Sequence, residues 1–430
     1  QHLRVQYHPR RIDRLRVPRQ QVDRCREPVL EPEDAANENR LAAESLLEFR
    51  AVSGVIPLQH RMQRHIIEVL ARRVVDEAVL DLPNWSMSGG AVAKLGYPPA
   101  KHGQEGRAQW YVQDAAHGLK YCACLETRRI GNETLLAVTV TSTNDDPDLL
   151  ALARRRCAAA LDKGYAAMLE PHVSWWRQFW SQSGLAVPEP DLQKYYVLCR
   201  YFYGAASRRG APPMPLQGVW TADNGGLPPW KGDYHNDLNT QMTYIGYHAA
   251  GHFDEGACYL DFLVKLTPVF TEFARDFYGT PGLSSPGVMS LAGQPLGGWG
   301  QYSLSPTMTS WNAHLFYLHW RYTLDEKFLR EQAYPWCKAA GECIRALLKP
   351  DENGLLKLFR SSSPEVFDNS RRAWLIPNSN YDLMCMKMQF LALVEMAEAL
   401  GHADEAAPWR ATAVALARCG VHRPARRRRP

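Results

Sequence analysis

The sequence predicts a mainly α-helical fold of helical hairpins, a solenoid or a closed toroid such as a partial (α/α)6 toroid, preceded by part of an antiparallel β-domain. Three observations predict it. From residue 190 onward helical patterns follow one another without strands. Short and long loops rich in Gly, Pro and Trp alternate between them. Before them lies a segment that alternates β-branched, aromatic and polar residues. A ring of six hairpins needs about twelve helices and the pattern gives about seven. Part of the ring is therefore expected to lie outside this chain.

Composition excludes several classes of protein. The chain has 430 residues, 46% of them hydrophobic and 22% charged, which suits a globular protein of two or three domains. It contains no apolar run long enough to span a bilayer. The formal charge of +5 arises at the ends, because residues 1–30 and 421–430 each carry a net +5 and the rest carries −5. Neither end interleaves aromatic residues with its arginines, so nucleic acid is not expected as a partner.

These shifts in composition divide the chain into five segments. Residues 1–45 lack sustained periodicity, and the Arg-rich end after residue 418 follows a helical pattern abruptly. The expected segments are an unassigned basic segment (1–45), a β-rich domain (46–144), a helical linker (145–189), the partial helical toroid (190–418) and a basic tail (419–430).

The β-rich domain is expected mainly at 85–144, after two amphipathic helical patterns at 41–54 and 62–80. His117-Gly118 and Gly131-Asn132 mark its turns, and LLAVTVTST predicts a strand with one apolar and one wet face. Asp145-Asp146-Pro147 ends this strand and starts a helix through about residue 161.

The linker and toroid follow from helical spacing. In 172–184 the residues Trp176, Phe179 and Trp180 form an aromatic stripe, which we interpret as packing between domains rather than stacking on a ligand. The predicted helices of the toroid are 191–207, about 237–250, 254–277, 308–323, 327–348, 380–400 and 403–418.

Metal and redox chemistry receive little support. The ten cysteines show no CxxC pair or regular framework, which is typical of buried thiols. His248 and His252 are spaced i, i+4, but the glutamate of an HExxH zinc motif is missing, and His235 adds no recognised ligand spacing. We expect neither a metal nor a cofactor.

The first segment with candidate substrate-binding and catalytic residues is 211–247, APPMPLQGVWTADNGGLPPWKGDYHNDLNTQMTYIGY. Its loop supplies Trp220 and Trp230, whose flat apolar faces suit sugar rings. Asp237 and Asn239 follow, and on an ideal helix they would point about 200° apart. Both reach one cavity only at a helix start or on irregular backbone, which Pro228-Pro229 and Gly232 favour. Asp237 could equally be an ordinary N-terminal helix charge.

The second stretch is KLFRSSSPEVFDNSRRAW (357–374), where three Ser and a Pro precede Glu365. This pattern predicts an irregular loop, and loops on a rigid scaffold often carry catalytic groups. Glycoside hydrolysis needs an acid to protonate the leaving oxygen, and Glu365 is the candidate. A solvated surface glutamate is the alternative interpretation.

At these stretches the chain resembles glycoside hydrolase family 95, the inverting α-L-fucosidase family of the six-hairpin glycosidases. PLQGVW and PPWKGDYHNDLNTQM are similar to its aromatic-flanked NxN motif, and SSSPE is similar to its general-acid loop. Residues 308–336 resemble the helices between them, and NSNYDLMCMKM resembles the helix that follows. The resemblance covers about 165–418 and implies that the preceding strands belong to an N-terminal β-sandwich.

The resemblance implies a role for each matching residue. Glu365 would be the general acid, and Asn239 would orient the attacking water. Asp237 stands where the family has the first Asn of its motif, and could serve as base or bind a different hydroxyl pattern. The substrate-binding residues would be Trp220, Trp230, His235, Trp299 and Asp382. The family's catalytic Asp lies in a segment beyond residue 418 that has no match here.

The expected function is therefore hydrolysis of a terminal α-linked sugar, fucose or a relative, with inversion and with a glycan as the partner. The resemblance implies an extracellular or periplasmic location, although no secretory leader is visible. One alternative is a polysaccharide lyase that uses Asn239, His235 and Tyr244 for β-elimination. The other is a carbohydrate-binding fragment without catalysis.

Overall fold

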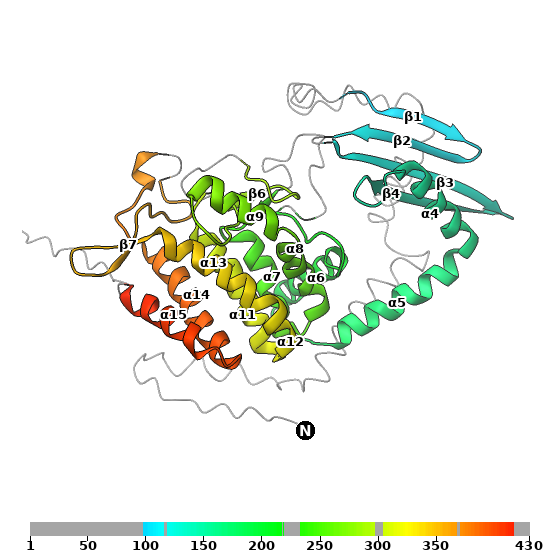
Figure 1. Cartoon of the computed structure of the whole chain (residues 1–430). Coiled ribbons are helices and arrows are strands. Elements are labelled where there is room, and N and C mark those ends of the chain that lie inside the picture. Colours follow the sequence, from blue (N-terminus) through cyan, green and yellow to red (C-terminus); the bar gives the residue numbers. More distant parts are fainter. Residues whose placement is uncertain are drawn as a thin grey trace, which may run out of the picture.

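A computed structural model describes residues 98–115, 118–216, 218, 233–296, 304–367 and 370–416. The helices predicted at 41–54 and 62–80 lie outside these residues, as do Trp220, Trp230 and Trp299. Within them the chain is mainly helical with one antiparallel sheet near its beginning (Figure 1). This arrangement confirms the predicted fold class.

The sheet has four strands in sequence order, each antiparallel to the next (Figure 1). The alternating segments form these strands because β-branched and aromatic side chains suit a pleated surface. A turn lies at Gly131-Asn132, as the sequence predicts, whereas His117 of the other predicted turn lies outside the described residues. The strands are β1 (Lys101–Glu105), β2 (Ala108–Asp114), β3 (Lys120–Ile130) and β4 (Glu133–Ser142).

The two faces of β4 differ in exposure. Ala137 and Thr141 are buried beneath helix α4 (Leu149–Lys163), whereas Val138 and Val140 are 59% and 62% exposed. The small Ala and Thr side chains let the helix approach closely, and Thr141 Oγ1 donates to the carbonyl of Leu149 over 2.7 Å. The helix therefore covers the face with Ala137 and Thr141, and the face with Val138 and Val140 is exposed.

Helix α5 (Tyr165–Ser181) leads from the sheet to the helical body (Figure 1). Its buried stripe of Trp176, Phe179 and Trp180 packs against Val197 of α6 (Pro190–Ala206). The guanidinium of Arg200 on α6 lies over the rings of Phe179 and Trp180. The stripe is therefore packing surface, as the sequence analysis favoured.

Every helix predicted for the toroid has a counterpart. The remaining helical segments are α7 (Asn239–Ala250), α8 (Phe253–Lys265), α9 (Thr267–Phe273), η4 (Ala274–Tyr278), α11 (Thr307–Thr323), α12 (Glu326–Phe328), η5 (Leu329–Ala333), α13 (Tyr334–Leu347), η6 (Arg371–Ala373), α14 (Asn380–Ala399) and α15 (Ala403–Ala415). Two short ladders join β5 (Tyr234–His235) to β6 (Val288–Met289) and β7 (Leu348–Pro350) to β8 (Leu356–Leu358).

Two predicted helices are interrupted. The one at 254–277 divides into α8, α9 and a π-helical turn, with a proline in the first turn of α9. The one at 327–348 contains the π-helical turn η5, after which a proline again opens α13. Proline lacks the N–H that a continuous helix needs, and in both cases it is the second residue of a new helix, Pro268 in α9 and Pro335 in α13.

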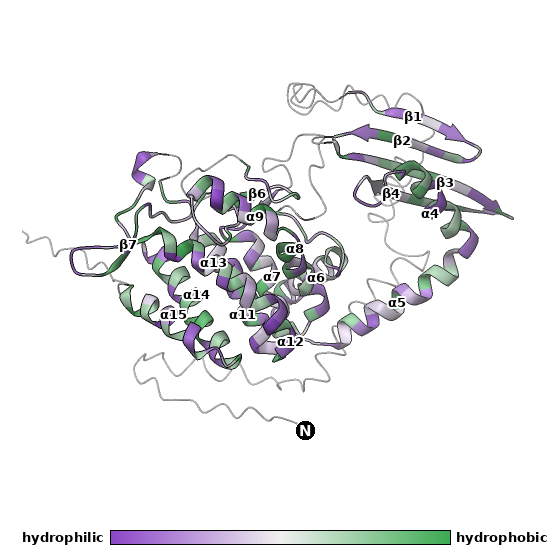
Figure 2. Cartoon of the chain, in the orientation of Figure 1, coloured by the Kyte–Doolittle hydropathy of each residue, from purple (hydrophilic) through white to green (hydrophobic). Residues whose placement is uncertain are grey.

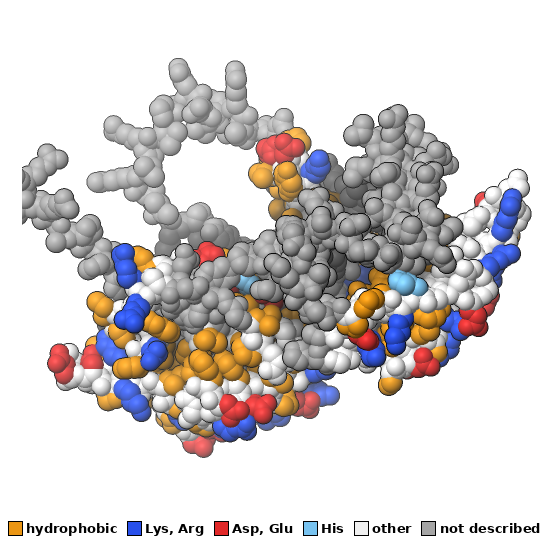
Figure 3. Space-filling model, turned by 90° about the horizontal axis from the view of Figure 1, so that it is seen from above, with side chains coloured by type: hydrophobic (Ala, Val, Ile, Leu, Met, Phe, Trp, Pro, Cys, Tyr) orange, Lys and Arg blue, Asp and Glu red, His pale blue; other side chains and the backbone are white. Residues whose placement is uncertain are grey.

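The helices pack around one large apolar core, to which α7, α8, α11, α13, α14 and α15 all contribute. Hydrophobic residues lie along the sides of helices that face neighbours (Figure 2). On the face seen in Figure 3, Lys and Arg side chains are mixed with Asp and Glu. No helix within the described ranges is both long and apolar enough to cross a membrane.

Candidate active site

A polar turn connects β5 to α7 and carries three of the predicted site residues. His235 ends β5, Asp237 lies in the turn, and Asn239 is the first residue of α7. The condition set by their spacing is thus met, because Asp237 precedes the helix and Asn239 begins it. Asp237 and His235 are each 5% exposed, whereas Asn239 is exposed.

The turn is fixed to the protein interior by Asn236, a residue that the sequence analysis did not single out. Its side chain donates to the carbonyl of Pro286 over 2.9 Å and accepts from the Tyr259 hydroxyl over 2.8 Å. Its backbone N–H donates to Gly287 over 2.6 Å. Since Asn236 has no exposed surface, its role is to hold the turn against the segment before β6.

His235 lies between two buried carboxylates. Its Nε2 is 3.1 Å from Asp233 Oδ1, and its Nδ1 is 3.8 Å from Asp237 Oδ1. Asp233 and His235 are two residues apart on an extended segment, and the turn that follows brings Asp237 to the other side of the imidazole. This acid, histidine, acid spacing was readable in the sequence, but the analysis did not use Asp233.

The carboxyl of Asp237 has a raised pKa. Burial raises it, the charge of His235 and the backbone N–H groups of Asp237 and Leu238 oppose this shift, and the charge of Glu365 adds to it. No described residue donates a hydrogen bond to Asp237 Oδ1, although this atom is buried. A buried carboxylate oxygen without a donor is costly, which is typical of a functional site rather than of a structural one.

Glu365 belongs to the Ser-rich loop after β8 and is exposed. Its φ is +57°, and that of Phe367 is +61°, so two non-glycine residues of this loop occupy the left-handed region. This conformation costs free energy and persists only where surrounding contacts impose it. The predicted irregular loop is present, and the field of Glu365 reaches Asp237 despite their separation in sequence.

Helix α11 is hydrogen-bonded to both α7, which follows the polar turn, and α14, which follows the Ser-rich loop. Near its beginning, Thr307 donates to Asp382 of α14 over 2.6 Å, and Asn312 accepts from Gln241 of α7 over 3.1 Å. These two residues are five positions apart, or about 7.5 Å along a helix axis. α11 lies between α7 and α14 (Figure 1) and contacts both. The helix that follows the polar turn and the helix that follows the Ser-rich loop are therefore both hydrogen-bonded to the beginning of α11.

Tyr381 is a further residue of the site that the sequence analysis missed. Its ring meets Trp311 of α11 edge to face at 6.1 Å. Burial raises its pKa well above the usual range, and the charge of Asp237 is among the smaller contributions. Tyr381, in the first turn of α14, thus lies on the side of that helix that faces α11.

Asp382 differs from the other predicted residues, because it has no exposed surface and both its oxygens accept hydrogen bonds from the protein. Tyr244, proposed for the lyase alternative, is also fully buried, and its hydroxyl bonds Ser207 and the amide of Met214. A residue so engaged cannot reach a substrate, which weakens the lyase interpretation.

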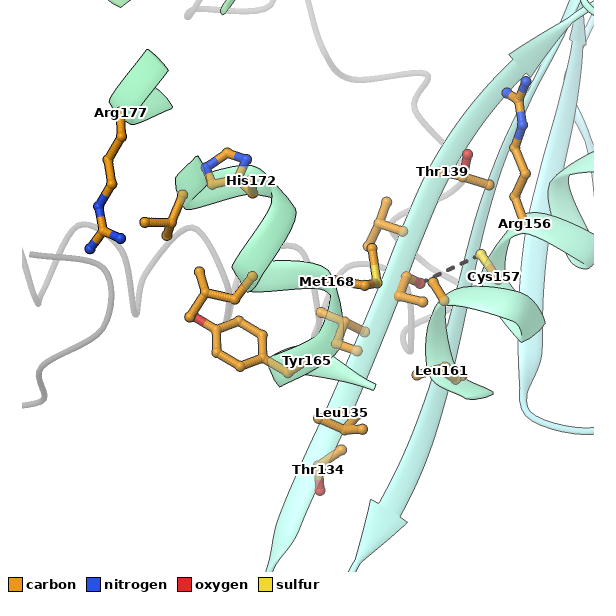
Figure 4. Close-up of a pocket in the computed structure, with 16 residues that line it drawn as sticks. Thr134, Leu135, Thr139, Arg156, Cys157, Leu161, Tyr165, Met168, His172 and Arg177 are labelled. Atoms are coloured by element: carbon orange, nitrogen blue, oxygen red, sulfur yellow. Dashed lines mark hydrogen bonds between the residues drawn. The ribbon is translucent and has the colours of Figure 1, made fainter. Parts of the chain in front are cut away.

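The hollow between β4, α4 and α5 offers a contrast (Figure 4). Its volume is about 890 Å³, and Leu135, Met168 and Cys157 are among the residues that line it. Its charged and titratable lining includes Arg156, His172 and Arg177, but neither Asp nor Glu. A cavity without a carboxyl cannot supply the acid of glycoside hydrolysis, so the carboxylate site in the helical body is the candidate. Among the described residues no group of three His, Cys, Asp or Glu has the geometry of a metal site.

Comparisons with known proteins agree with this location. The sequence profile described as "Glycosyl hydrolase family 95 catalytic domain" matches residues 177–423. A protein named "Probable alpha-fucosidase A" from Aspergillus niger is 27% identical over 237 residues, which is 48% of this chain and 29% of that protein. "Alpha-L-fucosidase 2" from Arabidopsis thaliana is 28% identical over 213 residues, covering 48% of this chain and 25% of that protein.

A solved structure is similar in fold. It is titled "Putative kojibiose phosphorylase from human microbiome", and the match has a TM-score of 0.57 at 11% identity, covering 75% of this chain and 47% of that chain. This chain therefore corresponds to less than half the length of each of these proteins.

Proposed function

This chain belongs to glycosyl hydrolase family 95. We propose that it carries the general acid, Glu365, and the base, Asp237, of an enzyme that hydrolyses a terminal α-linked fucose, or a related sugar, with inversion. The observation that carries the proposal is that two carboxylates distant in sequence belong to elements hydrogen-bonded to the start of α11, with the charge of Glu365 contributing to the raised pKa of Asp237. The names of the relatives from Aspergillus niger and Arabidopsis thaliana support fucose as the sugar.

In the proposed mechanism Glu365 protonates the glycosidic oxygen as the bond to the anomeric carbon breaks. Asn239 holds a water molecule on the opposite face of the sugar, and Asp237 removes its proton. Inversion requires room for this water between the two carboxyls, typically about 6.5–9.5 Å. The exposure of Glu365 gives it access to a leaving group that extends into solvent.

The raised pKa of Asp237 supports its role as base. A carboxylate of ordinary pKa is a weak base, and burial brings its proton affinity closer to the working pH. His235 would donate a hydrogen bond to a sugar hydroxyl, and its charge limits the rise in the Asp237 pKa. Trp220, Trp230 and Trp299 remain proposals for the sugar platform.

The test is to incubate the full chain with a fucosylated oligosaccharide and to follow the released sugar by proton NMR. The proposal predicts that the β-anomer of fucose forms first and that Glu365→Gln lowers the rate by about 10²–10⁴-fold. Glu352→Gln, an exposed carboxylate in the turn between β7 and β8, is the matched control and should be without effect.

Other outcomes would exclude the proposal. If the α-anomer forms first, the reaction retains configuration. An unsaturated product that absorbs in the ultraviolet would indicate a lyase. Oligosaccharide binding by a chain whose Glu365→Gln variant behaves as the parent would indicate a binding fragment.

A further inference from the structure

Asp382 lies beneath the Ser-rich loop and accepts hydrogen bonds on both oxygens. Oδ1 accepts from the Thr307 hydroxyl over 2.6 Å. Oδ2 accepts from the Ser362 backbone N–H over 3.1 Å and from the Ser361 hydroxyl. The Ser379 hydroxyl, 3.0 Å from Oδ2, divides its single proton between Asp382 and the carbonyl of Ser362. The carboxylate is thus surrounded by donors that belong to three separate segments.

These donors connect the loop to the rigid helices. Ser361 and Ser362 are four and three residues before Glu365, whereas Thr307 begins α11 and Ser379 caps α14. The carbonyl of Ser361 accepts from the amide of Leu375 over 2.9 Å, so the other end of the loop is fixed at the same point. A single buried carboxylate therefore holds the base of the loop to the start of two helices.

The loop needs such an anchor. Glu365 and Phe367 both have positive φ, a conformation that non-glycine residues adopt only under constraint. Both side chains are exposed, so burial of these two side chains does not supply the constraint. The bonds at Ser361 and Ser362 fix the backbone leading to Glu365 to the interior.

We propose that Asp382 is a positioning residue for the general acid, and that its carboxylate fixes the Ser361-Ser362 backbone so that Glu365 meets the leaving-group oxygen. This inference rests on the proposed function. It assigns Asp382 a different task from the sugar contact that the family resemblance implied. Its complete burial leaves no surface for a sugar.

Asparagine at this position tests the idea, because it keeps the shape but replaces one acceptor oxygen by a donor NH₂ group. Whichever way the amide is oriented, its nitrogen faces Thr307 on one side or the Ser361-Ser362 donors on the other. Asp404→Asn is the matched control. Asp404 also lies in the first turn of a helix, α15, but is exposed and distant in sequence from the loop.

Two substrates distinguish positioning of the acid from general damage. A fucosylated oligosaccharide has an alkoxide leaving group that requires protonation, whereas the dinitrophenolate of dinitrophenyl fucoside leaves without it. Asp382→Asn should lower kcat on the oligosaccharide at least tenfold and change kcat on the dinitrophenyl fucoside less than twofold, with KM of both preserved. Glu365→Gln should give the same pattern with a larger loss, and Asp404→Asn should match the parent.

Amide hydrogen exchange supplies a readout that does not depend on turnover. In Asp382→Asn the peptide covering 359–367 should exchange at least tenfold faster than in the parent, while peptides from α8 and α13 remain unchanged. Should Asp382→Asn fail to fold, Ser361→Ala removes one loop donor and should produce the same two effects at smaller amplitude.

Unchanged exchange at 359–367, or an equal loss of activity on both fucosides, would overturn the positioning role. If the parent chain hydrolyses neither substrate, the proposed function fails, and the exchange experiment alone decides whether Asp382 fixes the loop.

Discussion

Asp237 and Asp382 are both buried carboxylates whose pKa is raised by burial, yet their surroundings are opposite. Asp382 has donors on both oxygens, supplied by the starts of two helices and by a loop. Asp237 has a buried oxygen to which no described residue donates, and its neighbours are a histidine and a second acid. Burial alone therefore does not identify a catalytic carboxylate. Unsatisfied hydrogen-bonding capacity next to other titratable groups does so more specifically.

The largest expected effect is on kcat, which should fall when Asp237, the proposed base, is replaced. Asp237→Asn restores the amide that the family motif has at this position but removes the proposed base, so kcat should fall by about 10²–10⁴-fold. Initial rates on a fucosylated oligosaccharide check this. The exposed Asp254 of α8 provides the control Asp254→Asn. A variant as active as the parent would mean that Asp237 only donates or accepts hydrogen bonds and is not the base.

The second effect is on the free energy of unfolding, which should depend on Asp382 much more than on Asp237. Asp382→Ala leaves the buried donors Thr307, Ser361 and Ser362 without their acceptor, which should lower the free energy of unfolding by about 3 kcal/mol or more. Asp237→Ala removes a carboxylate that is poorly compensated and should change it by less than about 1 kcal/mol. Urea unfolding followed by tryptophan fluorescence measures both. Equal destabilisation would remove the distinction drawn here.

The smallest effect concerns pH. The charge of His235 holds the pKa of Asp237 down against burial, so His235→Gln should raise that pKa. Since a base acts only when ionised, the acidic limb of the kcat/KM profile should move to higher pH. His102→Gln, on strand β1 of the sheet, should leave the limb in place. A limb that stays or moves to lower pH would show that Asp237 does not set it.

The Glu365→Gln variant sharpens the same comparison, because its remaining activity reports Asp237 without the neighbouring charge. The negative charge of Glu365 contributes to the raised pKa of Asp237. Removing it should move the acidic limb of the residual activity to lower pH, opposite to His235→Gln. A shift in the same direction for both variants would contradict the assignment of the limb to Asp237.

The sequence predicted much of the fold. Periodicity located the helices of the toroid, and β-branched alternation with turn residues located the sheet. Proline explains where two long predicted helices divide. The alternation in β4 identified two faces, one of them wet, but not which one a helix would cover. Cys157 of α4 packs on the Ala137 side, and Val138 and Val140 lie on the exposed side.

The candidate site was predicted less completely. Asp237, Asn239 and Glu365 were identified from residue type and local backbone, and the roles given to them stay predictions. Asp233, Asn236 and Tyr381 were missed, although the alternation of Asp233, His235 and Asp237 was visible. Asn236 and Tyr381 could not be found in this way, since their partners Pro286, Tyr259 and Trp311 are distant in sequence.

By itself, the sequence determined which segments are helices and strands and which loops carry carboxyls, since these depend on side-chain periodicity and on the local limits that proline and glycine impose. The tertiary structure decided which carboxylate has donors on both oxygens and which keeps a buried oxygen to which no described residue donates. That difference depends on donors brought together from the starts of α11 and α14 and from the Ser361-Ser362 backbone, and no local pattern encodes which distant groups will meet.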